Sequence, residues 1–243
     1  MTGTGHIRIG TSGWQYDHWR GSFYPEELPK TGWLEHYAAH LGCVEVNNSF
    51  YNLPSEATLA EWRDGTPDGF RFAVKASRYI THMKKLKDPE EPVTRFLERV
   101  SVLEEKLGPI LFQCPPNWGA DPERLEAFCQ TLPDGHKYTF EFRDPSWHDD
   151  AIYDILARHG YAFCIFDIGD QQSPRQVTSD LVYVRLHGPG EPYQGSYDDE
   201  TLAGWLGAFS TWARQGKDVW CFFDNDQEGY AAQNALRARQ MRD

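Results

Sequence analysis

The sequence has no long apolar run, and it contains few cysteines. No stretch approaches the roughly 18 consecutive apolar residues of a transmembrane helix, and residues 1–5 lack the basic start and apolar segment of a signal peptide. The five cysteines are odd in number and show no Cys-x-x-Cys spacing. These absences predict a cytoplasmic protein with reduced, buried thiols and no membrane association.

Positive charge is also scarce. Lys and Arg number 24 against 36 Asp and Glu, so the formal net charge is −12. A surface that coats duplex nucleic acid needs an excess of basic side chains, and the composition argues against one while leaving room for a local basic patch. No internal repeat or linker marks a second domain, so we expect one domain over residues 1–243. A doubly wound open sheet is the alternative α/β architecture, and no G-x-G-x-x-G or P-loop supports it.

Short runs typical of β-strands recur along the whole chain. There are eight, at residues 6–10, 43–47, 70–76, 110–113, 138–142, 162–167, 181–187 and 219–223. Segments with helical periodicity lie between most of them, as at 33–41, 92–107, 121–132 and 149–159. Repeated β-then-α order requires parallel strands joined by crossovers, and eight units in this length predict a (β/α)8 TIM-type barrel in the α/β class.

One unit is irregular. The segment between the sixth and seventh runs, residues 168–181, is short, and its Asp170-Gln171-Gln172-Ser173-Pro174 stretch has no apolar periodicity. We therefore expect helix 6 to be missing or one turn long.

Polar residues enter the strands near their C-terminal ends. Glu45 and Asn47 share one face of the second run, and Glu141 and Arg143 share one face of the fifth. The other strands contribute Lys75, Gln113, Asp167, Arg185, His187 and the run Asp224-Asn225-Asp226. Barrel enzymes build their sites at this end, so the shared position predicts a polar pocket there. A buried Glu141–Arg143 ion pair that only fills the barrel is the alternative for that pair.

The charges of this pocket favour an anionic ligand. Arg143 and Arg185 can bind a phosphate or carboxylate with two hydrogen bonds each, and Lys75 adds a point charge. The same three cations disfavour a metal cage, and no H-x-H or H-E-x-x-H pattern accompanies the carboxylates, so we expect no metal and no cofactor.

Aromatic and basic residues follow the strands. The aromatic ones are Trp14, Trp19, Phe50, Tyr51, Trp118, Trp147, Tyr193 and Tyr197, and they suit stacking on bases or sugars. Packing over the barrel end is an equally good account of Trp14, Trp118 and Trp147. The stretch Arg78–Lys87 is basic, as expected of a solvated loop or of a cationic lip that attracts phosphate.

The chain resembles the YecE-like family, whose shared domain is domain of unknown function 72. The motifs that carry the resemblance are Gly10–Trp14, Glu45–Tyr51, Phe72–Lys75, Gln113–Pro116, Glu141–Arg143 with Ser146-Trp147, Tyr183–Gly188, Phe223–Asp226, and Ala232 with Asn234-Ala235. It implies a TIM-type barrel with a pocket formed by these residues. It implies no established reaction, since members have been compared with both sugar-isomerase-like and endonuclease-like barrels.

Our first hypothesis is an enzyme that acts on a phosphorylated sugar or nucleotide-like substrate. Glu45 or Glu141 would be the general base, and Lys75 and His187 would stabilise or protonate developing oxyanions. The residues expected to bind the substrate are Trp14, Asn47, Tyr51, Gln113, Arg143, Trp147, Asp167, Arg185 and Asn225.

Two other functions are compatible with the same residues. The first is a nucleic-acid-binding or repair-associated protein, like the endonuclease barrels, that takes a nucleotide or strand end into the pocket. The second is a non-catalytic protein that binds a metabolite. The sequence indicates neither a reaction type nor an oligomeric state.

Overall fold

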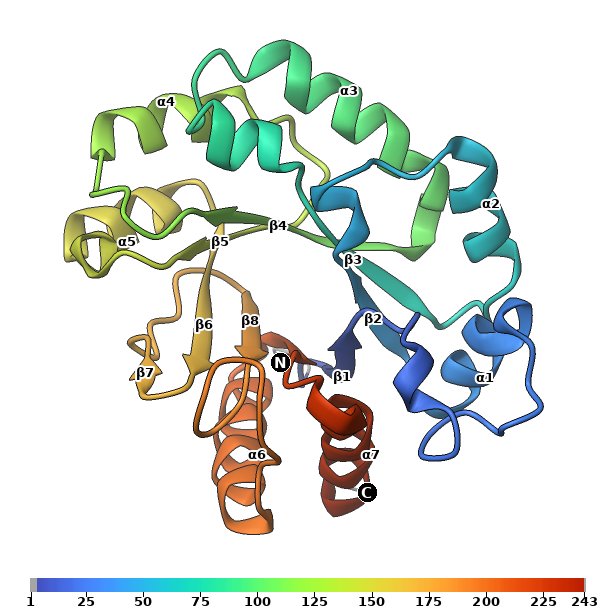
Figure 1. Ribbon diagram of the computed structural model, residues 1–243. Coiled ribbons are helices and arrows are strands. Elements are labelled where there is room, and N and C mark those ends of the chain that lie inside the picture. Colours follow the sequence, from blue (N-terminus) through green and yellow to red (C-terminus); the bar gives the residue numbers. More distant parts are fainter. Residues whose placement is uncertain (1–3, 243) are drawn as a thin grey trace.

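Parallel strand pairing closes the sheet into a barrel, as Figure 1 shows for the computed structural model, which describes residues 4–242. The barrel strands are β1 (Ile7–Ser12), β2 (Cys43–Val46), β3 (Arg71–Lys75), β4 (Leu107–Cys114), β5 (Tyr138–Phe142), β6 (Ala162–Ile168), β8 (Leu181–Leu186) and β9 (Asp218–Phe223). They pair in the order β5-β4-β3-β2-β1-β9-β8-β6, and a β5–β6 pairing completes the circle. The predicted TIM-type barrel is confirmed.

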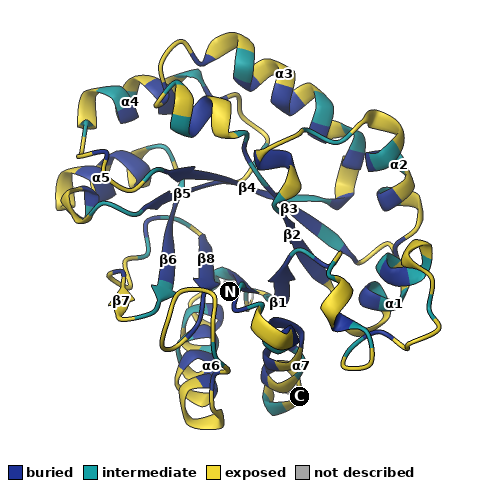
Figure 2. Ribbon diagram, viewed as in Figure 1, coloured by how far each residue is buried: buried dark blue, intermediate teal, exposed yellow. Residues whose placement is uncertain are grey.

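Helices surround this barrel and connect successive strands (Figure 1). They are α1 (Trp33–His40), α2 (Glu56–Asp64), α3 (Glu90–Val100), α4 (Pro122–Thr131), α5 (Asp150–Arg158), α6 (Asp199–Arg214) and α7 (Tyr230–Arg242). Figure 2 shows their inner faces buried and their outer faces exposed. Asp121, Asp149 and Asp198 each cap a helix N-terminus with the side chain, which explains where α4, α5 and α6 begin. None of the described helices is long and apolar enough to cross a membrane.

The period of two along each strand separates two cores. Outward residues such as Val44, Phe72 and Phe140 pack under the helices. The inward set forms a second apolar cluster, Cys43, Ala73, Leu111, Ala162, Cys164, Leu181, Tyr183, Trp220 and Phe222. These side chains fill the N-terminal part of the barrel, so the polar inward residues that follow them stand above an apolar floor.

The connection between β6 and β8 has no helix among its described residues, as predicted. A two-residue strand, β7 (Gln171–Gln172), instead pairs antiparallel with the end of β6. Side chains of the connection bind the main chain of β6: Ser173 accepts from the amide of Phe166 at 2.9 Å, and Thr178 accepts from that of Phe163 at 2.8 Å. Figure 1 shows this side of the barrel, between α5 and α6, covered only by β7 and its loop.

The predicted helix 92–107 is wrong at its C-terminal end. The α-helix ends at Val100, a 3-10 segment (Ser101–Lys106) follows, and Leu107 already belongs to β4. Glu104 has a positive φ of 51°, which breaks the helix. Gly108 lies in β4, where a Cβ would stand 2.9 Å from the Trp220 ring. The glycine therefore reflects close packing on the barrel floor.

Candidate functional site

A buried ionic network joins four strands inside the C-terminal half of the barrel. Its centre is Arg185 of β8, whose side chain is 2% exposed. The guanidinium donates to Glu45 of β2 through Nη2 and Nε, at 2.8 and 3.0 Å, to Glu141 of β5 through Nη1 at 2.8 Å, and to Asp224 after β9 at 3.1 Å. One arginine thus binds three carboxylates from strands far apart in the sequence.

Glu45 is saturated by this network. Its Oε1 also accepts from Ser12 Oγ at 2.8 Å and its Oε2 from the Tyr183 hydroxyl at 2.6 Å. The side chain is completely buried. A general base needs a free lone pair that faces the substrate. Both oxygens of Glu45 already accept hydrogen bonds, and neither is exposed. We expected Glu45 to be catalytic, but the structure places it as the anchor of Arg185.

Glu141 is likewise committed to neighbouring cations. One oxygen accepts from Arg185 and the other from Nε of Arg143, and the side chain is completely buried. Burial alone would raise the pKa of Glu141, but Arg143 and Arg185 lower that pKa well below its ordinary value. The Glu141–Arg143 ion pair that we weighed as an alternative is present, and both carboxylate oxygens accept from arginines.

His187, the residue after β8, is fully buried beside the same network. Its Nε2 lies 3.1 Å from Nη2 of Arg143, so this nitrogen accepts, and its Nδ1 lies 2.9 Å from Oδ2 of Asp224. Burial and the charge of Arg185 lower the pKa of His187. The Tyr193 ring contacts the imidazole edge to face, at 5.3 Å between centroids. A neutral His187 therefore orients Arg143 and does not reach the pocket as a proton donor.

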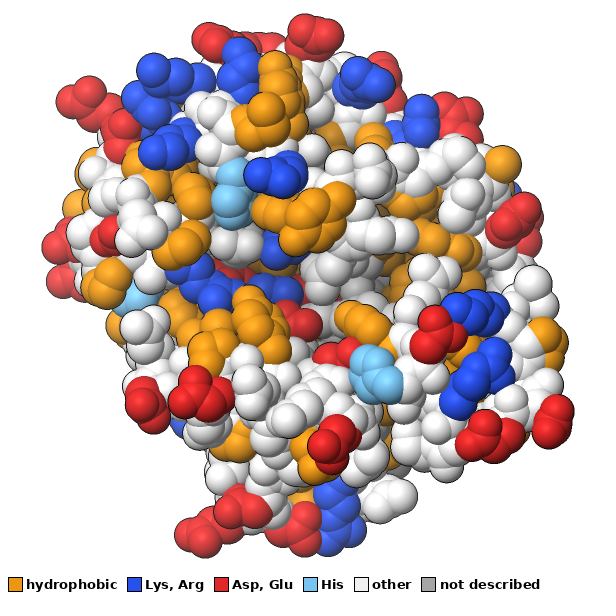
Figure 3. Space-filling model, in the orientation of Figure 1, with side chains coloured by type: hydrophobic (Ala, Val, Ile, Leu, Met, Phe, Trp, Pro, Cys, Tyr) orange, Lys and Arg blue, Asp and Glu red, His pale blue; other side chains and the backbone are white. Residues whose placement is uncertain are grey.

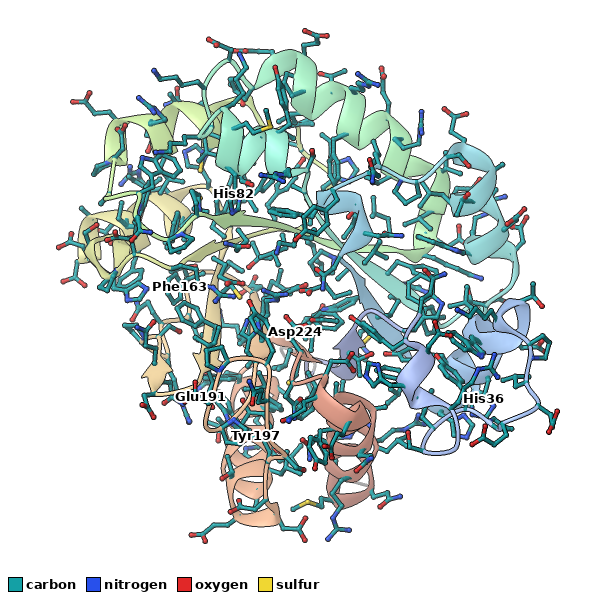
Figure 4. All side chains as sticks on the ribbon, viewed as in Figure 1. His36, His82, Phe163, Glu191, Tyr197 and Asp224 are labelled. Atoms are coloured by element: carbon teal, nitrogen blue, oxygen red, sulfur yellow. The ribbon has the colours of Figure 1, made fainter. Side chains whose placement is uncertain are left out.

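Above the network lies an open pocket, which we call the mouth pocket. It has a volume of about 560 Å3 and is lined by Phe50, Tyr51, Lys75, His82, Gln113, Pro116, Arg143, Ile168, Gly169, Asp170, Gln171, Gly190, Glu191, Pro192 and Tyr193. Figure 3 shows a hollow in this face where basic and acidic side chains are both visible. In Figure 4, His82 and Glu191 lie on opposite sides of the barrel opening, with Asp224 nearer its centre. The predicted residues Lys75, Gln113, Arg143 and Tyr51 all line this pocket.

Lys75 is the cation of the pocket that no carboxylate pairs with. No ion pair or side-chain hydrogen bond is made by its Nζ within residues 4–242, and this atom stands 4.3 Å from the centroid of the Phe50 ring. Burial lowers the pKa of Lys75 from 10.5 to about 8, and the charge of Arg185 acts in the same direction. The ammonium group is therefore poorly compensated in the free protein.

Several residues that we expected to bind substrate lie away from the mouth pocket. Trp14 packs on Trp62 between the sheet and the helices, at 4.8 Å between ring centroids, and Trp147 stacks on Phe142 at 4.4 Å. Both are almost fully buried, as in the packing alternative. Asp167 shares the outward face of β6, since it pairs with the outward Leu186 of β8. Strand alternation thus turns Asp167 away from the barrel interior.

Asn225 supports the mouth pocket indirectly. It is buried, and its Nδ2 donates to Gly195 O and to Asn234 Oδ1, both at 2.8 Å. Asn234 in turn accepts from the amide of Tyr197 and donates to its carbonyl. These amides hold the loop between β8 and α6, which contributes Glu191 and Tyr193 to the pocket lining. Asn47, like Asn225, has a buried Oδ1 without a hydrogen-bond partner in the part of the chain described.

His82 and Glu191 line the pocket although we did not expect them as site residues, and Phe50 and Tyr193 were expected only among the rings that suit stacking. His82 lies in a π-helical turn (Tyr79–Met83), a form often found at functional sites. Tyr193 has a positive φ of 66°, which is rare for a residue with a side chain. The basic stretch Arg78–Lys87 contains His82, but neither backbone feature can be predicted from residue types.

No set of three or more His, Cys, Asp or Glu side chains is arranged to hold a metal ion within residues 4–242. Asp226, which belonged to the predicted carboxylate run, is turned toward the loop after β1. Its carboxylate accepts from Nε1 of Trp19 at 2.6 Å and lies 3.1 Å from Nε2 of His18. All five cysteines are buried and free, as expected.

Comparison with known families fits this architecture. Residues 8–243 match the family model described as "Protein of unknown function DUF72". The chain belongs to the DUF72 family. The resemblance predicted from the motifs is thereby confirmed.

Related proteins support the assignment. The UPF0759 protein YecE of Escherichia coli K12 is 35% identical over 144 residues, which are 58% of this chain and 50% of YecE, so the match spans about half the length of that relative. YunF of Bacillus subtilis, also a UPF0759 protein, is 26% identical over 98% of this chain and 95% of its own. A solved DUF72 structure from Thermotoga maritima has a TM-score of 0.89 with 30% identity, covering 97% of this chain and 98% of that one. These names state a family and no reaction.

Proposed function

We propose that this DUF72 protein is an enzyme that binds a small phosphorylated sugar or nucleotide-like substrate in the mouth pocket. The observation that carries the proposal is the position of Lys75 and Arg143, two cations that line one pocket at the C-terminal end of a TIM-type barrel. A volume of about 560 Å3 lies within the usual range of roughly 300–1,000 Å3 for small-molecule sites.

The buried network supports this role by fixing the Arg143 side chain. Glu141 binds its Nε and His187 lies against its Nη2. Among the described residues, none accepts a hydrogen bond from Nη1. The Arg143 guanidinium also lies over the Phe166 ring, at 5.1 Å from the centroid. A guanidinium held on three sides loses little freedom when an oxyanion binds, and this preorganisation increases affinity.

The remaining lining groups suit the uncharged part of such a ligand. Gln113 is directed to the pocket floor, and its amide nitrogen donates to the Cys114 carbonyl at 2.7 Å, so its oxygen is the part available to a hydroxyl. Tyr51 and Tyr193 are 68% and 46% exposed. Flat, exposed rings next to polar groups favour a sugar or base. Lys75 and His82 take over the acid–base role that we had expected of Glu45 and Glu141, because they are the titratable groups that reach the pocket from β3 and its loop.

Calorimetry with the full-length protein tests the anion site. We expect D-ribose 5-phosphate to bind and D-ribose to bind at least about tenfold more weakly, because a charge-assisted phosphate contact contributes about 1.5–3 kcal/mol. Arg143→Met and Lys75→Met should each weaken the phosphate ester about tenfold or more. Lys84→Met is the matched control, since Lys84 lies outside the lining and pairs with Asp88. Equal affinity for the ester in all four proteins would refute the anion site.

Turnover separates an enzyme from a protein that only binds metabolites. Proton and phosphorus NMR of D-ribose 5-phosphate and of AMP, each incubated with the protein, should show loss of the starting resonances for the substrate class that is used. Retention of a bound ester through purification, with no chemical change over many hours, would favour the non-catalytic alternative.

The exposed rings around the mouth also favour a second candidate, a nucleic-acid-binding role. The large hydrophobic side chains exposed within residues 4–242 are Tyr51, Tyr79, Met83 and Tyr193, and all follow C-terminal ends of barrel strands. Lys85 lies over the Trp118 ring, at 6.0 Å from its centroid, in the same region. Aromatic rings interleaved with lysines are typical of sites that stack single-stranded bases.

A further inference from the structure

Lys75 occupies an unusual place for a lysine inside a barrel. Its carbonyl accepts from Ser49 Oγ at 2.6 Å, which joins the end of β3 to the segment after β2. Its amine points into the mouth pocket and rests on the Phe50 ring. The backbone at this position is therefore held while the amine stays free to reach a ligand.

Burial and the charge of Arg185 outweigh the carboxylates of Glu141, Glu45 and Asp224, so the pKa of this amine is lowered. Glu45 and Glu141, the carboxylates of the barrel interior on this side, already bind Arg185 and Arg143. A pKa of about 8 leaves about a tenth of Lys75 as the free amine at pH 7, whereas an ordinary lysine is almost fully protonated. Desolvation next to other cations is the usual way in which proteins activate a lysine as a nucleophile.

A second titratable group stands beside this amine. His82 lines the same pocket, contacts the Phe50 ring edge to face at 4.9 Å, and has its Nδ1 2.9 Å from the Thr81 hydroxyl. Burial, together with the charges of Lys75 and Arg78, lowers the pKa of His82 to about 4. The imidazole is therefore neutral at pH 7, and its Nε2 makes no hydrogen bond within residues 4–242.

We propose that Lys75 forms an imine with the substrate, and that the substrate is an aldehyde or ketone carrying a phosphate group. This inference rests on the proposed function and names the chemical class of its ligand. The free amine of Lys75 attacks the carbonyl carbon, a C–N bond forms, and one amine proton moves to the oxygen to give a carbinolamine. The hydroxyl then leaves as water after it takes up a proton, and a protonated imine remains. His82 relays these protons, and Arg143 holds the phosphate.

The imine also explains why the pocket pairs one activated lysine with an arginine fixed by a buried network. A protonated imine withdraws electrons from the adjacent carbon, so that a neighbouring C–H or C–C bond can break. The proton released, from carbon in the first case and from a hydroxyl in the second, passes to the neutral imidazole of His82, so the step needs no buried carboxylate base. The saturated state of Glu45 and Glu141 is consistent with that chemistry.

Reductive trapping tests the inference on the unmodified protein. Pyridoxal 5′-phosphate serves as the probe, with sodium borohydride to reduce the imine and peptide mass mapping to locate it. We expect a stable adduct at Lys75 with the mass of the probe less one oxygen atom. Its formation should be at least about tenfold faster than at Lys84, and at least about tenfold faster than the reaction of Lys75 with pyridoxal, which lacks the phosphate.

Two variants make the test independent of the probe's general reactivity. Lys75→Arg keeps the positive charge and cannot form an imine, so the pocket adduct should be lost. The melting temperature of this variant shows whether the fold is kept. Lys84→Arg removes a half-buried lysine outside the pocket lining and should leave the Lys75 adduct unchanged. A rate at Lys75 that is half-maximal near pH 8, rather than near pH 10.5, would support the inference further.

Glycerol 3-phosphate, which has no carbonyl group, separates this inference from the proposed function. If it binds the mouth pocket but borohydride traps probe equally at Lys75 and at surface lysines, the imine is refuted and the anion site stands. If no phosphate ester binds while Lys75 is labelled first by both aldehydes, the reactive lysine stands and the phosphorylated substrate class is wrong. If no phosphate ester binds and Lys75 is labelled no faster than surface lysines, both proposals are overturned.

Discussion

At the scale of single residues, the structure separates charges that hold the barrel together from charges that face a ligand. Glu45, Glu141 and Arg185 are fully buried and bind one another. Lys75 and Arg143 come from the same inward faces but stand one layer nearer the mouth. Arginine occurs in both layers, so for Arg185 and Arg143 only the depth along the strand distinguishes their roles.

The buried position of Glu45 leads to a prediction on stability. Glu45→Ala should lower the free energy of unfolding by about 3–5 kcal/mol, because it leaves the buried Arg185 and Tyr183 with unmatched groups. Urea denaturation measures this loss. Glu123→Ala, at an exposed site of α4, is the control and should change the free energy by no more than about 0.5 kcal/mol. If Glu45→Ala kept wild-type stability and lost all activity, Glu45 would instead be a catalytic base.

The pKa of Lys75 leads to a second prediction, on pH dependence. Because that pKa is about 8, the lysine is protonated below pH 8 and neutral above it, so affinity for glycerol 3-phosphate should fall as the pH rises from 7 to 9.5. Between these values binding should take up protons, since the anion stabilises the charged form. Calorimetry in buffers of different ionisation enthalpy measures the uptake. Lys75→Arg should bind without this pH dependence, and an unchanged profile in that variant would show that another group titrates.

At the scale of elements, side chains of the connection between β6 and β8 make the contacts that a helix makes between other strands of the barrel. Thr178 Oγ1 accepts from the amide of Phe163 and donates to the carbonyl of Tyr161. Arg175 lies over the Trp205 ring of α6, 4.1 Å from its centroid. The segment therefore satisfies strand groups and covers apolar surface without helical structure of its own.

This arrangement predicts a local dependence on the Thr178 hydroxyl. Thr178→Val keeps the shape of the side chain but leaves the buried Phe163 amide without its acceptor, so we expect a loss of about 1–3 kcal/mol in the free energy of unfolding. Thr211→Val on the exposed face of α6 is the matched control and should have a small effect. Hydrogen exchange should show faster exchange at Phe163 in the first variant. Equal losses in both variants would mean that the hydroxyl of Thr178 contributes nothing special.

At the scale of the whole molecule, the net charge of −12 opposes approach of any polyanion, and the basic segment after β3 is a local exception. Lys84 is already paired with Asp88, and Lys85 lies over Trp118. These lysines stand beside the mouth pocket rather than along an extended groove. A single-stranded end is therefore a better match than a duplex.

The salt dependence of binding tests whether a single-stranded nucleic acid contacts the basic segment. If nucleic acid binds, affinity for a single-stranded oligonucleotide should fall steeply with salt, and the variant with Lys84, Lys85 and Lys87 all changed to Gln should reduce the log–log slope by about 2. Lys137→Gln with Lys217→Gln, at the opposite end of the barrel, is the control and should leave the slope unchanged. Fluorescence anisotropy across a salt series gives both slopes. Identical slopes in the two variants would rule out the basic segment as the contact surface.

The sequence by itself determined the barrel, because a strand buried on both faces and a helix buried on one carry different periodicities that can be read locally. It also determined which strands carry polar inward residues, including Lys75, Glu141 and Arg185, and the lack of a helix before β8. These features depend on neighbours in the chain.

Only the tertiary structure decided what those residues do. Whether a carboxylate is a base or an anchor depends on its partners. For Glu45 these are Ser12 on the paired strand β1 and Tyr183 on β8, which meets Glu45 only when the barrel closes. Packing on Trp62 and Trp118 likewise buried Trp14 and Trp147. Barrel closure also left Lys75 without a counterion, because the nearer carboxylates bind arginines more strongly through several hydrogen bonds at once. Long-range contacts cannot be read from local residue types. They therefore decide which residues support the site and which can react with a ligand.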